Sequence, residues 1–283
     1  PASLPRIVDS CGPIGPTTAL EGAPPIVALV GDQQASLLGQ GCVRPGLAKI
    51  TFGTGGMLDA CTGATAPDSE ARSAHGTFPI IGWRHAGATT WGVEAIMLSA
   101  GTAVQWLVDD LGILDSAAAS DALAASVPDA GGVAFVPALL GLGTPEWDFG
   151  ARGALLGITR GTGRAHITRA VLEGVAQRGA DLVEAAEQDA GLSLPALRID
   201  GGMSANATFV QALADATRRP VEVSPVLEAT TLGAGLVGHV ATGAFASIDD
   251  LADTWRPRTV VEPGTPLDRD RWREAVRRAS GWE

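Results

Sequence analysis

An acid and an amide follow a short apolar segment near the start of the chain. Residues 26–30 read Ile-Val-Ala-Leu-Val and predict a buried strand, which is followed by Gly31, Asp32 and Gln33. Open α/β folds bind their ligands where strands end, and a carboxylate there can take a proton from a substrate hydroxyl. Asp32 is therefore a candidate general base. The alternative is that Asp32 only caps a helix that begins near Gln33.

Three loops combine glycine with small polar residues at sharp turns: 52–56 (Phe-Gly-Thr-Gly-Gly), 100–102 (Ala-Gly-Thr) and 200–206 (Asp-Gly-Gly-Met-Ser-Ala-Asn). Because glycine has no side chain, backbone amides in such loops can closely approach a phosphate or an adenine. The alternative is that these are ordinary turns in a chain that holds 37 glycines. Three such loops in one α/β chain favour a nucleotide site.

The best-known nucleotide motifs are absent from the sequence. There is no Gly-x-x-x-x-Gly-Lys-Ser/Thr, and no Gly-x-Gly-x-x-Gly that follows a strand and opens a helix. The nucleophile-elbow motif Gly-x-Ser-x-Gly is absent as well. A P-loop is therefore excluded, and a dinucleotide-binding fold is unsupported. A nucleotide enzyme with this sequence would use a different arrangement to hold its phosphates.

The composition is that of an acidic globular protein. Hydrophobic residues make up 46% and charged residues 18% of the 283, and the net charge is −11 with Lys49 as the only lysine. These values argue against disorder and against binding to nucleic acid. The three cysteines are widely spaced and the four histidines do not cluster, so neither a metal site nor a disulfide framework is expected. We expect a cytoplasmic protein without a signal peptide or a membrane span.

The elements that would position these residues follow from the hydrophobic periodicity. Strands are predicted at 26–30, 47–54, 57–62, 78–83, 88–93, 133–136, 153–158, 197–200 and 221–223. Helices are predicted at 34–40, 96–111, 116–126, 164–190, 205–217, 230–242 and 271–281. Gly191 should end the longest helix, and Ser204 should cap the helix at 205–217. Early strands followed by alternating helices and strands predict an α/β layered fold.

Taken together, these segments resemble the FGGY-type carbohydrate kinase family, which phosphorylates polyols and sugars, and most closely its members that act on glycerol. The matching segments are 31–35, 52–55, 105–107, 141–148, 151–161, 200–206 and 231–234. The resemblance implies an actin-like ATPase (ribonuclease H-like) fold, with a mixed sheet flanked by helices. ATP or ADP and Mg²⁺ are the implied cofactors.

The resemblance covers only the second of the family's two domains, because no Asp-x-Gly-Thr-Ser/Thr strand is present. It implies that residues 26–283 are the C-terminal nucleotide-binding kinase domain. Residues 1–25, rich in proline and glycine, would be a lead-in left from the crossover between the domains. The chain starts at Pro1 in what reads like the middle of a loop, so we expect it to be cut from something longer.

Carried over residue by residue, the resemblance makes Asp32 the general base and places Gln33 on the polyol. Met57 would also contact the substrate, but it stands where members that act on glycerol usually have an aromatic residue, which leaves the polyol open. The implied nucleotide-binding residues are Thr54, Gly101, Gln105, Gly202 and Asn206. Mg²⁺ would bridge the phosphates, and no metal ligand is expected from this chain.

We therefore predict ATP-dependent phosphoryl transfer to a polyol hydroxyl, with glycerol converted to glycerol 3-phosphate as the first choice. A ketose or another sugar alcohol, such as one like erythritol, is the second choice, and a nucleotide-binding fragment without catalysis is the third. An N-terminal kinase domain is the implied partner, so the isolated chain should bind ADP weakly and be inactive. A homo-oligomer is possible, whereas neither nucleic acid nor a membrane is an expected partner.

Overall fold

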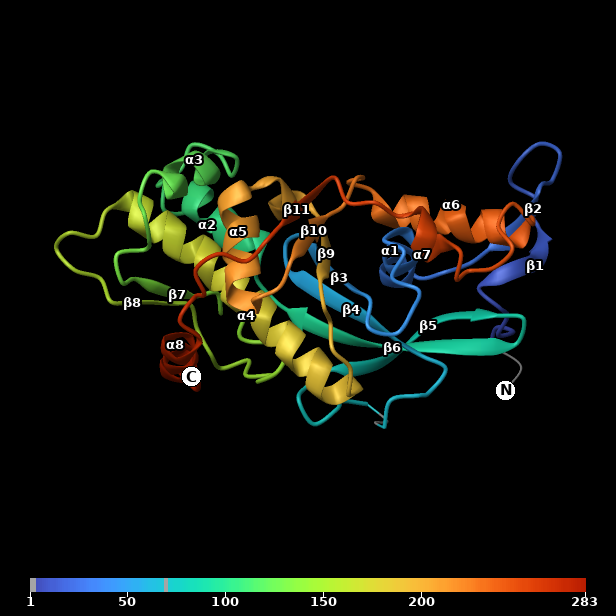
Figure 1. The fold of residues 1–283 in the computed structure, drawn as a ribbon, viewed down its shortest axis with the longest axis horizontal. Helices are drawn as coiled ribbons and strands as arrows, with labels where there is room; N and C mark the ends of the chain where they lie inside the picture. The colour runs from blue at the N-terminus through green and yellow to red at the C-terminus, as the bar shows by residue number, and fades with distance from the viewer. Residues whose placement is uncertain (1–3, 69–70) are drawn as a thin grey trace.

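A mixed β-sheet runs through the centre of the fold (Figure 1). The computed structural model describes residues 4–68 and 71–283, and within them nine strands form this sheet in the order β11-β10-β9-β3-β4-β6-β5-β1-β2. The strands are β1 (Cys11–Pro16), β2 (Pro25–Ala28), β3 (Ala48–Phe52), β4 (Gly56–Gly63), β5 (Phe78–His85), β6 (Ala88–Met97), β9 (Leu197–Asp200), β10 (Val221–Val223) and β11 (Thr259–Val261). A separate ribbon pairs β7 (Ala134–Val136) with β8 (Ala154–Leu156).

The pairing of the strands brings two of the glycine loops to one edge of the sheet. β3, β4, β6 and β5 are antiparallel neighbours, whereas β9 joins the other side of β3 in parallel. Thr51 lies opposite Asp200 in that parallel pair. Because parallel strands end at the same edge, the loops that follow Phe52 and Asp200 leave the sheet side by side.

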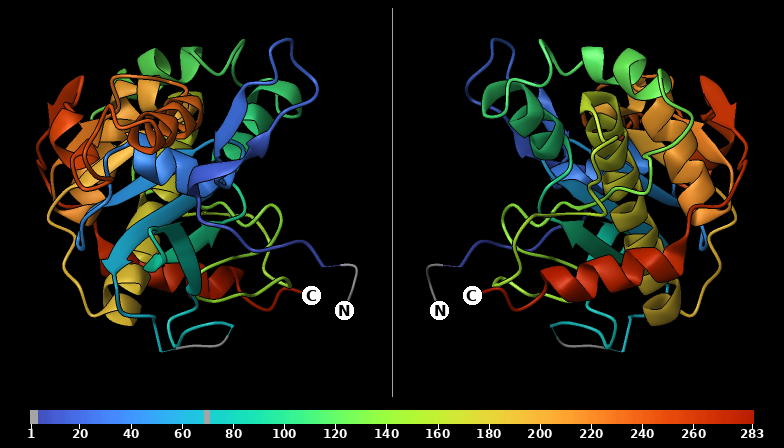
Figure 2. Two further views of the ribbon diagram at one scale, coloured as in Figure 1. Left: turned by 90° about the vertical axis from the view of Figure 1, so that its right-hand side faces the viewer. Right: turned by 90° about the vertical axis from the view of Figure 1, so that its left-hand side faces the viewer.

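Helices cover both faces of the sheet (Figure 2). They are α1 (Asp32–Gly39), α2 (Gly101–Asp109), α3 (Ala119–Ala125), α4 (Arg164–Ala190), α5 (Ala207–Thr217), α6 (Ala229–Ala241), α7 (Leu251–Thr254) and α8 (Arg269–Ala279), with a 3₁₀ turn η1 (Gly202–Ala205). The larger core joins α4 and α5 to one face, and a smaller core joins α1 and α6 to the other. Along β4, Leu58 enters the first core and Cys61 the second, as expected when alternate side chains point to opposite faces.

Helix α1, which carries Asp32, is fixed by an unusually close crossing with α6. A Cβ atom on Gly39 would lie 2.1 Å from the Ala229 carbonyl oxygen, and one on Gly233 would lie 1.7 Å from that of Ala35. Only glycine allows the two backbones to approach so closely. The glycine- and alanine-rich sequence of α6 therefore sets the position of α1 on the sheet.

The longest predicted helix and two short predicted strands match the structure. Helix α4 has the predicted bounds and ends at Gly191, which adopts a left-handed conformation with φ 63°. β9 and β10 also coincide with their predictions. Among the described residues, no helix is long and apolar enough to cross a membrane.

Several predictions about the elements are wrong, for reasons of tertiary packing. The segment that contains β2 is not buried: β2 is an edge strand, and Ile26 and Leu29 are 41% and 61% exposed. The helix predicted to begin at Ile96 begins at Gly101, because β6 continues to Met97. Apolar residues alone do not show whether a segment lies inside the sheet or along its border.

Helix caps account for further differences. Asn206, rather than Ser204, caps α5, because its side-chain oxygen accepts a hydrogen bond from the Phe209 amide. Ser204 lies in η1, where its hydroxyl donates to the Gly201 carbonyl. Helix α8 begins two residues before the prediction, at Arg269, and is capped by Asp268. β11 and α7 were not predicted.

Candidate active site

The three glycine loops meet around one cavity of about 530 Å³. Its walls come from the β3–β4 loop, the start of α2, the start of α3 and the η1 turn before α5. The five residues predicted to bind the nucleotide all line it: Thr54, Gly101, Gln105, Gly202 and Asn206. Loops that are far apart in the sequence thus form a single site, as the nucleotide interpretation requires.

The first two loops are held together by their backbones. The Gly101 amide donates to the Gly53 carbonyl at 2.9 Å, and the Thr54 carbonyl accepts from the amides of Ala100 (2.8 Å) and Thr102 (3.2 Å). A Cβ atom on Gly101 would lie 2.5 Å from the Gly53 carbonyl oxygen. Glycine at position 101 is therefore needed for the loops to meet, and α2 begins at their junction.

At the other end of the cavity, Asn206 joins two helices. Its Oδ1 accepts from the Phe209 amide at 2.8 Å and its Nδ2 donates to the Ser120 hydroxyl at 2.9 Å. Asp121 strengthens the same junction, because its carboxylate accepts from the amide and the hydroxyl of Thr208. Both polar ends of Asn206 are thus engaged within the protein, and Asn206 shapes the cavity by fastening α3 to α5.

Asp32 is exposed and lies in the first turn of α1. Gly31 is the N-cap residue, and no side chain caps the helix there. One carboxylate oxygen of Asp32 accepts from the Gln33 amide at 2.8 Å. A carboxylate in this place is favoured by the positive end of the helix dipole and is open to a ligand.

Helix α1 is tied to the same strands that lead into the nucleotide cavity. The Ser36 hydroxyl donates to the buried carboxylate of Asp200 at 3.3 Å, directly before the Gly201–Gly202 turn. Lys49 on β3 donates to Oε1 of Gln33 at 2.7 Å, three residues before Phe52. Through β3 and β9, the Asp32 segment and the glycine loops therefore share one rigid support.

Lys49 belongs to a buried group of charges beneath α1. Its ammonium lies 2.7 Å from a carboxylate oxygen of Asp59 and 3.0 Å from the Thr51 hydroxyl, and the side chains of Lys49 and Asp59 are 0% exposed. Glu94 lies opposite Asp59 on β6. Burial and the neighbouring Asp59 raise the pKa of Glu94 to about 7, although Lys49 opposes this shift. None of these three charged residues is among the predicted site residues.

A signal for this group was present in the sequence. Lys49 is the only lysine and interrupts an apolar strand, and Asp59 does the same on the strand that returns. Charged residues are rarely buried unless they are paired. Their pairing depends on the register between Lys49 and Asp59, which the structure supplies.

Met57, the third residue predicted to contact substrate, is half-buried on β4. It precedes Asp59 by two residues, so both side chains point to the α1 face of the sheet. Thr51 is its neighbour in register on β3. Met57 and Gln33 are therefore on the same side of the sheet, whereas Leu58 is in the opposite core.

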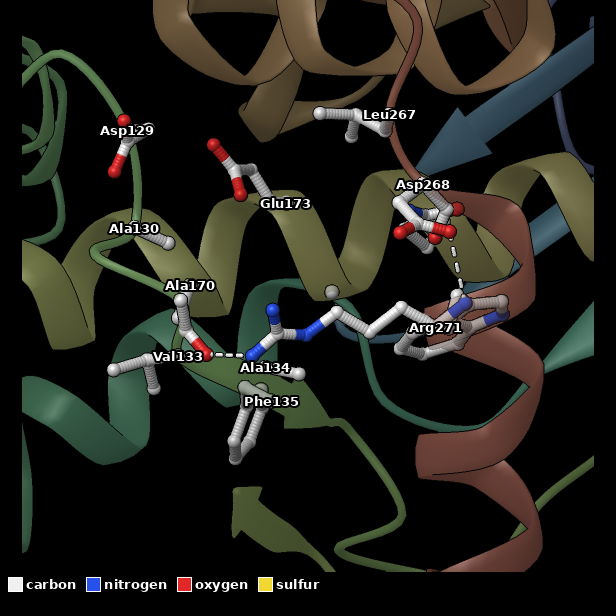
Figure 3. A pocket seen from close by; sticks show the side chains of 14 residues that line it. Asp129, Ala130, Val133, Ala134, Phe135, Ala170, Glu173, Leu267, Asp268 and Arg271 are labelled. Carbon is white, nitrogen blue, oxygen red and sulfur yellow. Dashed lines mark hydrogen bonds between the residues drawn. The ribbon is translucent and has the colours of Figure 1, made fainter. Parts of the chain in front are cut away.

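A second cavity, of about 180 Å³, lies between β7, α4 and α8 (Figure 3). Glu173 and Asp268 line it, and Arg271 crosses it to donate to the Gly132 carbonyl. Burial raises the pKa of Glu173. Within the described residues this cavity shares no lining residue with the first and holds none of the predicted site residues.

The profile of the FGGY family of carbohydrate kinases, C-terminal domain, matches residues 48–242. The chain belongs to this family. The match includes Met57 and every predicted nucleotide-binding residue, whereas Asp32 and Gln33 lie just before it.

Curated relatives of this FGGY chain extend the match to its full length. Glycerol kinase from Aromatoleum aromaticum is 46% identical over 289 residues, and glycerol kinase from Symbiobacterium thermophilum is 45% identical over 290. Each alignment covers 100% of this chain, but only 58% and 57% of the respective relative. The chain thus spans a little more than half the length of these relatives.

Solved structures place this FGGY chain in the expected fold. Plasmodium falciparum glycerol kinase with ADP matches 96% of this chain and 55% of its own, with a TM-score of 0.86 at 30% identity. Xylulose kinase from Rhodospirillum rubrum matches 98% of this chain and 57% of its own, with a TM-score of 0.80 at 25% identity. The predicted fold class, the actin-like ATPase fold of the second FGGY domain, is therefore confirmed.

Proposed function

We propose that this chain is the nucleotide-binding half of an ATP-dependent polyol kinase, with glycerol as the preferred substrate. The observation that carries the proposal is the single cavity lined by Thr54, Gly101 and Gly202. The strands β3 and β9, which lead into two of its loops, also contact α1, the helix of Asp32. Two further findings support it. The relatives named above are glycerol kinases, and a matching structure was solved with ADP.

In the proposed reaction, Asp32 accepts the proton of one polyol hydroxyl. The hydroxyl oxygen forms a bond to the γ-phosphorus of ATP, the bond from that phosphorus to the β–γ bridging oxygen breaks, and ADP leaves. Gln33 holds the polyol beside Asp32. The loops at Thr54, Gly101 and Gly202 would hold the nucleotide by backbone contacts, since phosphoryl transfer depends mainly on positioning.

Mg²⁺ is the cofactor that this reaction implies. No three His, Cys, Asp or Glu side chains in the described part of the chain are arranged to hold a metal ion. The described residues therefore do not fit a site that binds Mg²⁺ on its own. We propose that Mg²⁺ enters on the phosphates of ATP.

A second substrate class, a ketose or another sugar alcohol, is favoured by one residue. Met57 is flexible and unbranched, so it can adapt to carbon chains of different length. Solved structures that resemble the chain include a xylulose kinase. A panel of glycerol, erythritol and ketoses, compared by kcat/KM, separates the two candidates.

We also propose a domain division: residues 26–283 as the kinase domain, and 1–25 as the connection from an N-terminal domain. β1 lies within that connection and pairs with β5 and β2 at one end of the sheet. The N-terminal half of a relative is the proposed partner. The proposed compartment is the cytoplasm, which agrees with Cys11, Cys42 and Cys61 being free and buried.

The test is a fusion of this chain with the N-terminal half of the Aromatoleum aromaticum glycerol kinase. We expect the fusion to phosphorylate glycerol with ATP, and the isolated chain to bind ADP weakly without turnover. Glycerol-dependent ADP production measures turnover, and calorimetric titration measures the binding of ADP. A folded fusion that binds ADP but phosphorylates no polyol or ketose would contradict the proposal.

A further inference from the structure

Lys49 holds the side-chain amide of Gln33 in one orientation. Its Oε1 lies 2.7 Å from the ammonium nitrogen of Lys49. A lysine ammonium has three donors and no acceptor, whereas a glutamine amide has a donor end and an acceptor end. Contact with Lys49 therefore selects the oxygen, and the Nε2 group is the end left to bind another molecule.

Lys49 is itself held so that it cannot turn away. Its charge is balanced by Asp59 at 2.7 Å, and a third contact is made with the Thr51 hydroxyl at 3.0 Å. Lys49 and Asp59 are shielded completely from solvent. Because an unpaired charge in such a place is very unfavourable, the ammonium stays between Asp59, Thr51 and Gln33.

Glu94 completes the arrangement from β6. It lies opposite Asp59 in register, and burial raises the pKa of both carboxyl groups, although Lys49 opposes these shifts. Lys49 is therefore the cation near two carboxyl groups whose charged forms are disfavoured by burial.

We infer that Lys49 is a positioning residue, which orients Gln33 so that its Nε2 group donates a hydrogen bond to the substrate hydroxyl. This inference rests on the proposed kinase function. An ionised Asp32 can accept a hydrogen bond from the hydroxyl but cannot donate one. Gln33 in this orientation can donate a hydrogen bond to the hydroxyl but cannot accept one. The hydroxyl is therefore held through its lone pair by Gln33 while its proton faces Asp32.

The consequence is selectivity for a neutral hydroxyl that both donates and accepts. A flipped Gln33 would present a second acceptor beside Asp32, and the hydroxyl has only one proton to give. The orientation of one amide thus affects polyol binding more than nucleotide binding, because the nucleotide cavity has no contribution from Gln33 or Lys49 among its described lining residues.

The test uses the fusion enzyme with the double substitution Lys49→Met/Asp59→Leu, which removes both charges and leaves neither one unpaired. Such replacements of a buried ion pair by apolar residues of similar size are often tolerated. We expect the KM for the polyol to rise about tenfold, as for the loss of one hydrogen bond, while the KM for ATP stays within about twofold.

A matched control is Arg169→Met/Glu173→Leu, which removes a partly buried ion pair on α4, with an N–O distance of 2.8 Å, far along the chain from Gln33. This control should leave both KM values unchanged. In a Gln33→Met background the double substitution at Lys49 and Asp59 should add nothing further to the polyol KM, because Lys49 acts through Gln33.

Gln33→Glu tests the donor without any change at Lys49. The new carboxylate keeps an oxygen for Lys49 but has no donor to offer the substrate, so the polyol KM should rise as it does in Gln33→Met. If Gln33→Glu binds the polyol as well as the parent fusion does, the inference is wrong. The same holds if a folded Lys49→Met/Asp59→Leu fusion keeps the parental polyol KM.

The positioning claim can also be separated from the kinase claim. In the chain itself, the side-chain ¹⁵N–¹H signals of Gln33 should form one sharp pair, and Lys49→Met/Asp59→Leu should shift or broaden them. If the parent fusion has no kinase activity, the proposed function fails. If the Gln33 signals do not change in the double variant, the positioning by Lys49 fails whatever the activity.

Discussion

The two faces of the central strands differ in what their side chains do. On β3, Ile50 and Phe52 enter the apolar core against α4 and α5, whereas Lys49 points to α1 and contacts Gln33. On β4, Leu58 likewise enters the apolar core, whereas Asp59 points to α1 and pairs with Lys49. Neighbouring residues of one strand therefore serve two purposes: one set stabilises the fold and the other supports the candidate site.

The apolar core sets the position of the candidate site. The apolar face fixes the register of β3, β4 and β9, and that register brings together Lys49 with Asp59 and Thr51 with Asp200. A change on the apolar face should reduce stability first. A change on the α1 face should reduce activity first.

The largest expected effect comes from the α1 face. In the fusion enzyme, Asp32→Asn should lower kcat by about 10²–10⁴-fold, the usual contribution of a general base. The free energy of unfolding should change little, because Asp32 is exposed. Steady-state kinetics and urea unfolding measure the two quantities.

The control for Asp32 is Asp268→Asn, an acid-to-amide change at the N-cap of α8, where asparagine is also an effective cap. It should leave turnover unaltered. Equal turnover by the Asp32→Asn enzyme and its parent would remove Asp32 from the role of base.

Two adjacent residues of β4 give the next comparison. Leu58→Ala empties a side-chain position that is 0% exposed and should cost about 2–5 kcal/mol of unfolding free energy. Met57→Ala, at the half-buried neighbour, should cost less stability but raise the polyol KM several-fold. If Leu58→Ala changed the polyol KM more than Met57→Ala did, the assignment of one face to stability and the other to substrate would be incorrect.

The smallest effect is a pH dependence. The pKa of Glu94 is raised in the folded protein from 4.5 to about 7, so the folded state holds a proton that the unfolded state releases. The stability that depends on this proton is present below pH 4.5 and is lost as the pH rises toward about 7. Glu94→Gln should therefore gain stability relative to the parent between pH 5 and pH 8, as measured by urea unfolding of the chain. A constant difference between the two proteins over that range would contradict the shift.

Local patterns predicted much of the fold and drew attention to the glycine loops that line the first cavity. The apolar stripe of α4 and the glycine that ends it are visible in residues 164–191 alone. The glycine loops are likewise recognisable from their own residues. The exposure of β2 could not be predicted, because it depends on the place of that strand at the edge of the sheet. The lone lysine in an apolar strand indicated a buried charge, but the partners of Lys49 could not be predicted, because Asp59 and Glu94 meet only through strand pairing.

The proposed nucleotide site is tested most directly by calorimetric titration of ADP into the chain, compared with Gly101→Val. The added side chain would collide with the Gly53 carbonyl, where even a Cβ atom would lie 2.5 Å from the oxygen, and should separate the loops that contain Gly53 and Gly101. We predict saturable one-to-one binding of ADP to the parent and to Lys49→Met/Asp59→Leu, and at least a tenfold weaker affinity for a folded Gly101→Val variant. Unchanged affinity in Gly101→Val, or no saturable binding by the parent, would contradict a nucleotide site at the three glycine loops.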